Sequence, residues 1–217
     1  MRGRTILRRL AWGAILLLVS AVLLAHPIVY FGNEVRGKVI DDETGAPLEG
    51  TSIVAEWQIY VMGIQPHSGD RIKVLEAETN KNGDYVLPAW GPAPRPPWGA
   101  LLNRSPMITF FKSGYYPKTV MNERNSDDMY RDSDFNGKTI RLKKFDGNFE
   151  LLSQYLGTAS PAQGGCWREC PHYVMALDAE ARRLVKIVPP AMLLFALPQT
   201  LETMTGDDRA YFSQFQK

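Results

Sequence analysis

The stretch VRGKVIDDETGAPLEGTSIVAEW, residues 35–57, decides the fold. It contains a strand-like run, an acidic turn ending in Thr-Gly, a Pro-Leu-x-Gly step and a second strand-like run. Gly45 can adopt a positive φ without a Cβ clash, so the chain can reverse there. Pro47 has no N–H to donate to a β-ladder, which places it in the connection. The stretch predicts two strands joined by a defined turn.

The strand pattern continues through residues 34–145. Apolar side chains alternate strictly from Ile53 through Trp57 to Val61, as they do in a strand with one buried face. About seven such runs are separated by Gly, Pro and Asn-Gly turns, a spacing typical of an all-β sandwich or barrel. Asn82-Gly83, flanked by apolar alternation, predicts a β-hairpin. We therefore expect a mainly β domain over residues 34–145.

Three motifs of this region resemble the carboxypeptidase regulatory-like domain: GKVIDDETGAPLEGTSIVAEW, ETNKNGDYVLP and ITFFKSGYYP. The resemblance implies a seven-stranded transthyretin-like (prealbumin-like) Greek-key sandwich. It departs from the family pattern at Thr51, where the family often has Ala, and in a long insertion after Trp57. In that family the domain is usually an accessory module without catalysis, which implies an interaction or scaffold role.

Residues 1–31 have the pattern of an export signal. Basic residues precede the uncharged run LAWGAILLLVSAVLLA, residues 10–25. The apolar character continues to Phe31, which makes about 22 residues where about 20 span a bilayer. The positive-inside rule places the N-terminus in the cytoplasm. We expect a single-pass membrane protein whose folded part is exported to the periplasmic or extracellular side, with an uncleaved signal-anchor. A cleaved signal is the alternative, although Leu23 and Ala25 match a cleavage site poorly.

The charge distribution argues against a nucleic-acid partner. The chain has 25 basic and 23 acidic residues, and four of the arginines precede the first apolar run. The remainder is slightly acidic, whereas a nucleic-acid footprint needs a basic stripe on the folded part. The expected partners are the membrane, through the N-terminal anchor, and an envelope protein.

Cys166 and Cys170 form the motif CWREC. In an exported protein two nearby thiols tend to form a disulfide, and we predict this pair as one. The loop that it closes is very short, so its entropic stabilisation would be small. Buried free thiols are one alternative. Metal or redox chemistry with His172 close by is another.

The segment AWGPAPRPPWGALLNRSP, residues 89–106, interrupts the strand pattern. Long connections of this kind are often functional. Trp90, Arg95 and Trp98 are therefore candidate contacts for a ligand or partner. The alternative is that both tryptophans pack on the sandwich and the prolines stiffen the path.

Few residues qualify for acid–base or metal chemistry. Of the three histidines, His26 lies in the anchor, and His67 and His172 have no metal-ligand spacing. The acidic segment that contains Asp127, Asp128, Asp132 and Asp134 lacks the ordered spacing of an EF-hand loop. We expect no catalytic centre, no cofactor and no metal site.

Residues 146–217 depart from the strand pattern. DGNFELLSQYLGT and ALDAEARRLVKIVPP have apolar residues at helical spacing, which predicts a helical C-terminal extension packed on the sandwich. An amphipathic helix that docks to a partner is the alternative.

Two functions from different classes fit these features. The first is a non-enzymatic interaction or scaffold module at the envelope. The second is a small hydrolase or carbohydrate-binding domain with residues 89–106 as a wall of its site. A concave pocket with convergent polar groups beside Trp90 or Trp98 would favour the second.

Overall fold

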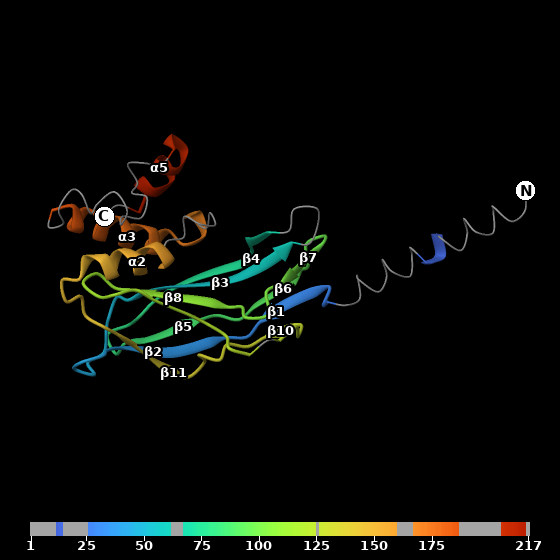
Figure 1. The fold of residues 1–217 in the computed structure, drawn as a ribbon, viewed down its shortest axis with the longest axis horizontal. Helices are drawn as coiled ribbons and strands as arrows, with labels where there is room; N and C mark the ends of the chain where they lie inside the picture. Colours follow the sequence, from blue (N-terminus) through green and yellow to red (C-terminus); the bar gives the residue numbers. More distant parts are fainter. Residues whose placement is uncertain are drawn as a thin grey trace, which may run out of the picture.

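The structure is a computed structural model that describes residues 12–14, 26–61, 67–124, 126–159, 167–186 and 205–215. These residues form a mainly β protein with a helical layer at the C-terminal end (Figure 1). The strands are β1 (Val29–Gly32), β2 (Val35–Asp41), β3 (Ser52–Val61), β4 (His67–Glu78), β5 (Asp84–Leu87), β6 (Trp90–Pro94), β7 (Gly99–Leu101), β8 (Met107–Phe111), β9 (Lys118–Met121), β10 (Tyr130–Arg131) and β11 (Lys138–Leu142). The helices are α2 (Phe149–Ala159), η2 (Trp167–Glu169), α3 (Pro171–Val185) and α5 (Gly206–Ser213).

The strands form three sheets. The largest has the order β4-β3-β8-β9, with β7 also paired to β3, and its pairs are antiparallel. A second has the order β11-β2-β5, in which β11 runs parallel to β2. A small third sheet has the order β10-β1-β6 and lies at the end of the β-domain where β7 also lies (Figure 1).

The main core fills the space between the sheets. Ile53, Ala55 and Trp57 point into it from alternate positions of β3, which is the periodicity that the sequence predicts. Trp57 meets Trp90 edge to face, with ring centroids 5.2 Å apart, a favourable arrangement for aromatic pairs. Aromatic burial on this scale supplies much of the hydrophobic stabilisation of a small sandwich.

A second hydrophobic core lies on the opposite face of the same large sheet. Val54 of β3 and Phe111 of β8 point away from the main core and pack with Leu152, Tyr173 and Leu177 of the helical layer. Strand β3 is therefore buried on both faces, and its central residues form a continuous buried run. Figure 1 shows α2 and α3 lying over this sheet.

The structure corrects the expected localisation. No helix that it describes combines the length and the apolar character needed to cross a bilayer. This finding overturns the expectation of a single-pass membrane protein with an exported folded part. Most of the predicted anchor, residues 1–31, lies outside the described residues.

The Asn82-Gly83 turn also differs from its prediction. Gly83 has a φ of +76°, as a tight reversal requires, and its N–H donates to the Asn80 carbonyl at 2.8 Å. The strands on either side, however, belong to different sheets, because β4 pairs with β3 and β5 pairs with β2. The turn is an arch between the two layers and not a β-hairpin.

The mainly β class is confirmed, but the number of strands is larger than expected. The described residues contain eleven strands. Short strands at the end of the sandwich, β1, β6, β7 and β10, account for the addition. Strands β6 and β7 lie within residues 89–106, where the sequence predicts a connection.

Candidate functional site

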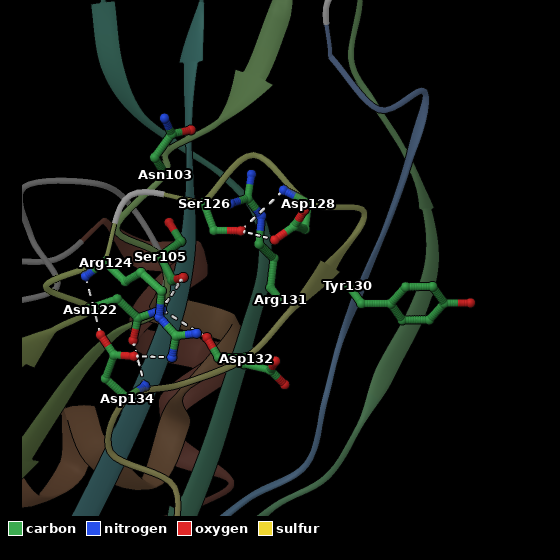
Figure 2. Close-up of a pocket in the computed structure, with 10 residues that line it drawn as sticks. All are labelled: Asn103, Ser105, Asn122, Arg124, Ser126, Asp128, Tyr130, Arg131, Asp132 and Asp134. Carbon is green, nitrogen blue, oxygen red and sulfur yellow. Dashed lines mark hydrogen bonds and ion pairs between the residues drawn. The ribbon is translucent and has the colours of Figure 1, made fainter.

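A polar hollow lies where residues 103–105 meet the segment 122–134 (Figure 2). Its volume is about 30 Å³, which is room for water and not for an organic ligand. The lining residues are Asn103, Ser105, Asn122, Arg124, Ser126, Asp128, Tyr130, Arg131, Asp132 and Asp134. In Figure 2 the ring of Tyr130 points away from the others, so the hollow is walled by amides, hydroxyls and charges.

Arg131 is the most unusual residue of this wall. Its side chain is 1% exposed, and burial lowers the pKa of its guanidinium. Nη2 lies 3.4 Å from the Leu101 carbonyl and 3.3 Å from Asp127, while Nε and Nη1 have no partner among the described residues. The guanidinium also lies 5.5 Å from the centre of the Tyr30 ring, a cation–π contact. Bare buried donors are unfavourable, so these two nitrogens lower the stability of the wall.

Asn122 ties the two walls of the polar hollow together. Its Nδ2 donates to the carbonyls of Ser105 and Asp132, at 2.9 and 2.8 Å. Its Oδ1 accepts the Asp134 N–H at 2.9 Å. A buried amide that makes three hydrogen bonds fixes the segments around it, so Asn122 acts here as a structural clasp.

The acidic side chains next to this clasp are bound by the protein itself. Asp134 accepts Nη2 of Arg124 at 2.8 Å and the Glu123 N–H at 2.9 Å. The Arg124 hydrogen bond is the main reason why the pKa of Asp134 lies below its ordinary value. Among the described residues, no group of His, Cys, Asp or Glu side chains is arranged to hold a metal ion.

A larger hollow adjoins the polar hollow at Asp134. It is an open groove of about 380 Å³ between β9 and β11, within the range of ligand sites. Its lining residues are Lys118, Glu123, Asp134, Phe135, Lys138, Thr139 and Ile140. The two hollows share Asp134, so they adjoin at this residue.

His26 and His172 are not among the residues that line either hollow. His172, at the start of α3, places Nδ1 3.1 Å from the Glu76 carboxylate of β4. The same carboxylate accepts the Tyr173 N–H, as an anion at a helix N-terminus does. His26 bonds to Asp127, and Asp127 also contacts Arg131. Strand β4 begins at His67, whose side chain lies outside the described residues.

The three predicted contact residues have different surroundings. Trp90 is 9% exposed and belongs to the main core, whereas Trp98 is 59% exposed and has a φ of +59°. Arg95 donates its N–H to the Ile28 carbonyl at 2.9 Å and Nη1 to the His26 carbonyl at 3.2 Å, which holds the segment before β1 against the loop. None of the three lines the polar hollow or the groove.

The predicted disulfide stays a prediction. Cys170 is fully buried in the second core, at the start of α3. Cys166 lies outside the described residues.

Several residues of the two hollows were not singled out from the sequence. Asn122, Arg131, Lys118 and Lys138 come from short strands or their ends, and each type is usually a surface residue. The proline-rich loop does contribute to the polar hollow, but through Asn103 and Ser105 and not through its tryptophans. The acidic segment was the feature of the sequence that could have indicated the polar hollow, because Asp128, Asp132 and Asp134 all line it.

Comparison with known proteins gives no family. No family model and no curated protein matches the sequence. Among solved structures, a 9R-lipoxygenase from Cyanothece PCC8801 matches with a TM-score of 0.28 and 12% identity over 75% of this chain. The chain spans 25% of the length of that lipoxygenase. The major plantain pollen allergen Pla l 1 matches with a TM-score of 0.27 and 14% identity, over 52% of this chain and 93% of the allergen. These similarities are too low to indicate a function.

Proposed function

We propose that this chain is a non-enzymatic interaction or scaffold module built on a seven-stranded transthyretin-like sandwich of the carboxypeptidase regulatory-like type. The strand pairing supports this fold: β11-β2-β5 and β4-β3-β8-β9 together supply seven strands in two facing sheets. The remaining short strands are then additions at one end.

One observation carries the proposed role. The carboxylates around the polar hollow are bound by other groups of the protein, as Asp134 is by Arg124 and Asp132 is by Asn33. Groups held in this way stabilise loops. A general base instead needs a hydrogen-bonding position free for substrate. Rigid loops on a filled sandwich are the usual framework of a binding surface.

The second candidate is a small hydrolase or carbohydrate-binding domain walled by residues 89–106. In its favour, Asn103 and Ser105 of that loop line the polar hollow. Against it, a hollow of about 30 Å³ is far smaller than the several hundred Å³ of ligand sites, and Trp90 is part of the core. The interaction role therefore has the stronger support.

Photo-crosslinking of the full chain in its native cells tests the interaction role. A photoreactive residue is placed in turn at four exposed positions on different faces: Val86, Trp98, Met121 and Tyr155. An interaction module should give a discrete adduct of higher mass from at least one position. Adducts from none of the four would contradict the proposal.

Hydrolysis assays test the enzymatic alternative. Chromogenic esters and glycosides should be hydrolysed by the wild-type chain no faster than by Ser105→Ala, which removes a hydroxyl of residues 89–106 from the polar hollow. A wild-type rate that disappears in this variant would show that this loop is catalytic.

A further inference from the structure

The groove between β9 and β11 is bordered by two strand edges from different sheets. Among the strands that the structure describes, β9 pairs only with β8 and β11 pairs only with β2, so each is the edge strand of its sheet. Each edge strand directs alternate backbone N–H and C=O groups away from its partner. No backbone hydrogen bond joins residues 118–121 to residues 138–142, all of which the structure describes.

The two edges are held together at both ends of the groove. At one end the Tyr116 N–H donates to the Lys143 carbonyl at 2.9 Å. At the other the Asn122 side chain accepts the Asp134 N–H at 2.9 Å. The segments 116–122 and 134–143 therefore run antiparallel between two fixed points. The second segment is longer and contains a turn at residues 134–137, so the strands cannot close into a ladder between these points.

The groove has an apolar floor and basic sides. Half-buried Phe135 supplies apolar surface, with Ile140 of the main core behind it, while Lys118 and Lys138 stand at the two edges. Nζ of Lys118 lies 3.5 Å from the Arg141 carbonyl, across the groove. Of the two acidic residues in the lining, Asp134 is neutralised by Arg124. The side chains that remain to meet a ligand are thus mainly basic.

We propose that this groove binds an acidic peptide segment in extended conformation, by strand addition to the free edges of β9 and β11. The proposal rests on the interaction role given above and names the chemistry of the partner. Backbone groups of the two edges would supply the affinity, as in other complexes formed by β-augmentation. Acidic side chains facing Lys118 and Lys138 would supply the specificity.

The lysines also exclude other occupants. Charged residues on edge strands, lysine especially, prevent pairing between copies of a protein. Strand β9 of a second copy would bring its own Lys118, and β11 its own Lys138 and Arg141, so a homodimer here would place like charges together. A neutral strand would leave both ammonium groups without a counter-charge.

Peptide binding to the full chain tests the proposal. The probe is a fluorescein-labelled ten-residue peptide of alternating Thr and Glu, compared with peptides in which Gln or Lys replaces every Glu. Fluorescence anisotropy should show binding of the Glu peptide alone, weakening as salt is added. Reversing both charges in Lys118→Glu/Lys138→Glu should weaken that binding about tenfold or more and allow the Lys peptide to bind.

A control matched in charge to Lys118→Glu alone separates the groove from general surface charge. Lys81→Glu reverses one exposed lysine in the turn before β5, which lies on the side of β2 opposite β11. It should leave the affinity unchanged within about twofold. If Lys81→Glu weakened the affinity for the Glu peptide as much as Lys118→Glu does, the proposal would be overturned, because binding would then depend on net charge and not on the groove.

Hydrogen exchange locates the peptide independently of affinity. On binding, the amides of residues 119–121 and 139–141 that face the groove should exchange more slowly, and those of β5 should not change. Binding without protection at these edges, no binding of the Glu peptide, or a dimer of the chain through this face would each overturn the proposal. The interaction role is decided separately by the cross-links.

Discussion

Gly83 offers the sharpest test of the fold, because two physical effects coincide there. Its φ is +76°, where a residue with a Cβ is unfavourable by about 1–2 kcal/mol. A Cβ built on Gly83 would also lie 2.4 Å from the Val39 carbonyl oxygen. That oxygen belongs to the backbone of β2, so no side-chain rotation can relieve the contact. Overpacking of this kind adds about 1–3 kcal/mol.

Gly45 separates the two effects. It has a similar φ of +70°, but a Cβ there would meet no atom within 4 Å. Gly45→Ala should therefore lower the free energy of unfolding by about 1–2 kcal/mol. Gly83→Ala should lower it by about 2–4 kcal/mol, because the contact with β2 is added to the backbone effect.

Urea unfolding of the full chain, followed by tryptophan fluorescence, measures both values. The core pair Trp57 and Trp90 provides the signal, and an unchanged m-value would show that the unfolded state is unaffected. In a thermal melt, the Tm of Gly83→Ala should lie roughly 4–16 °C below that of the wild type. Equal losses for the two variants would refute the close approach of Gly83 to β2, and no loss in either would refute the positive φ at both turns.

Three further predictions concern turns, loops and the helical layer. Hydrogen bonds to Asp41, the strongest from the Thr44 N–H, lower the pKa of its carboxyl group to about 2. The stability that these bonds give should be present above about pH 4 and lost as the pH falls towards 2. A profile of Tm against pH should show this loss at acid pH, and the loss should be smaller in Asp41→Asn. Trp90→Ala truncates a core side chain and should lower the free energy of unfolding by about 3–5 kcal/mol. Trp98→Gly removes the side chain from an exposed residue with a positive φ. In the same urea assay it should leave the free energy of unfolding unchanged or raise it by up to about 1 kcal/mol. Ser113→Ala removes a 2.6 Å hydrogen bond to a buried carboxylate of α3 and should lower the free energy of urea unfolding by about 2 kcal/mol.

Local features could be predicted from the sequence because local physics determines them. The alternation along β3 and the helical spacing in residues 149–156 each reflect a buried face whose period is visible in one segment. The positive φ of Gly45 follows from its turn in the same way. Arrangements between distant segments leave no such period, so the order of the sheets was not visible.

The Asn82-Gly83 turn shows where sequence reasoning stops. An arch between sheets and a hairpin within one sheet need the same tight reversal and the same glycine. What distinguishes them is whether the next strand pairs with β4 or with β2, and that depends on packing across the core. The groove between β9 and β11 likewise forms where two segments of unequal length, far apart in the sequence, lie side by side. Burial of Arg131 was equally invisible, because arginine is seldom buried without a close partner.

The double burial of β3 has a consequence for the protein during its synthesis. Among the described residues, the face of the large sheet that carries Val54 and Phe111 is covered mainly by the C-terminal helical layer, and the last residue packed there is Phe215. Roughly 70 residues separate the end of β11 from that position, and ribosomes need roughly 3–14 s to add them. For those seconds the nascent sandwich has its strands complete and one sheet face still uncovered. The newly made chain is therefore most vulnerable to aggregation, and most open to chaperones, after its β-domain has been synthesised and before its last helix emerges.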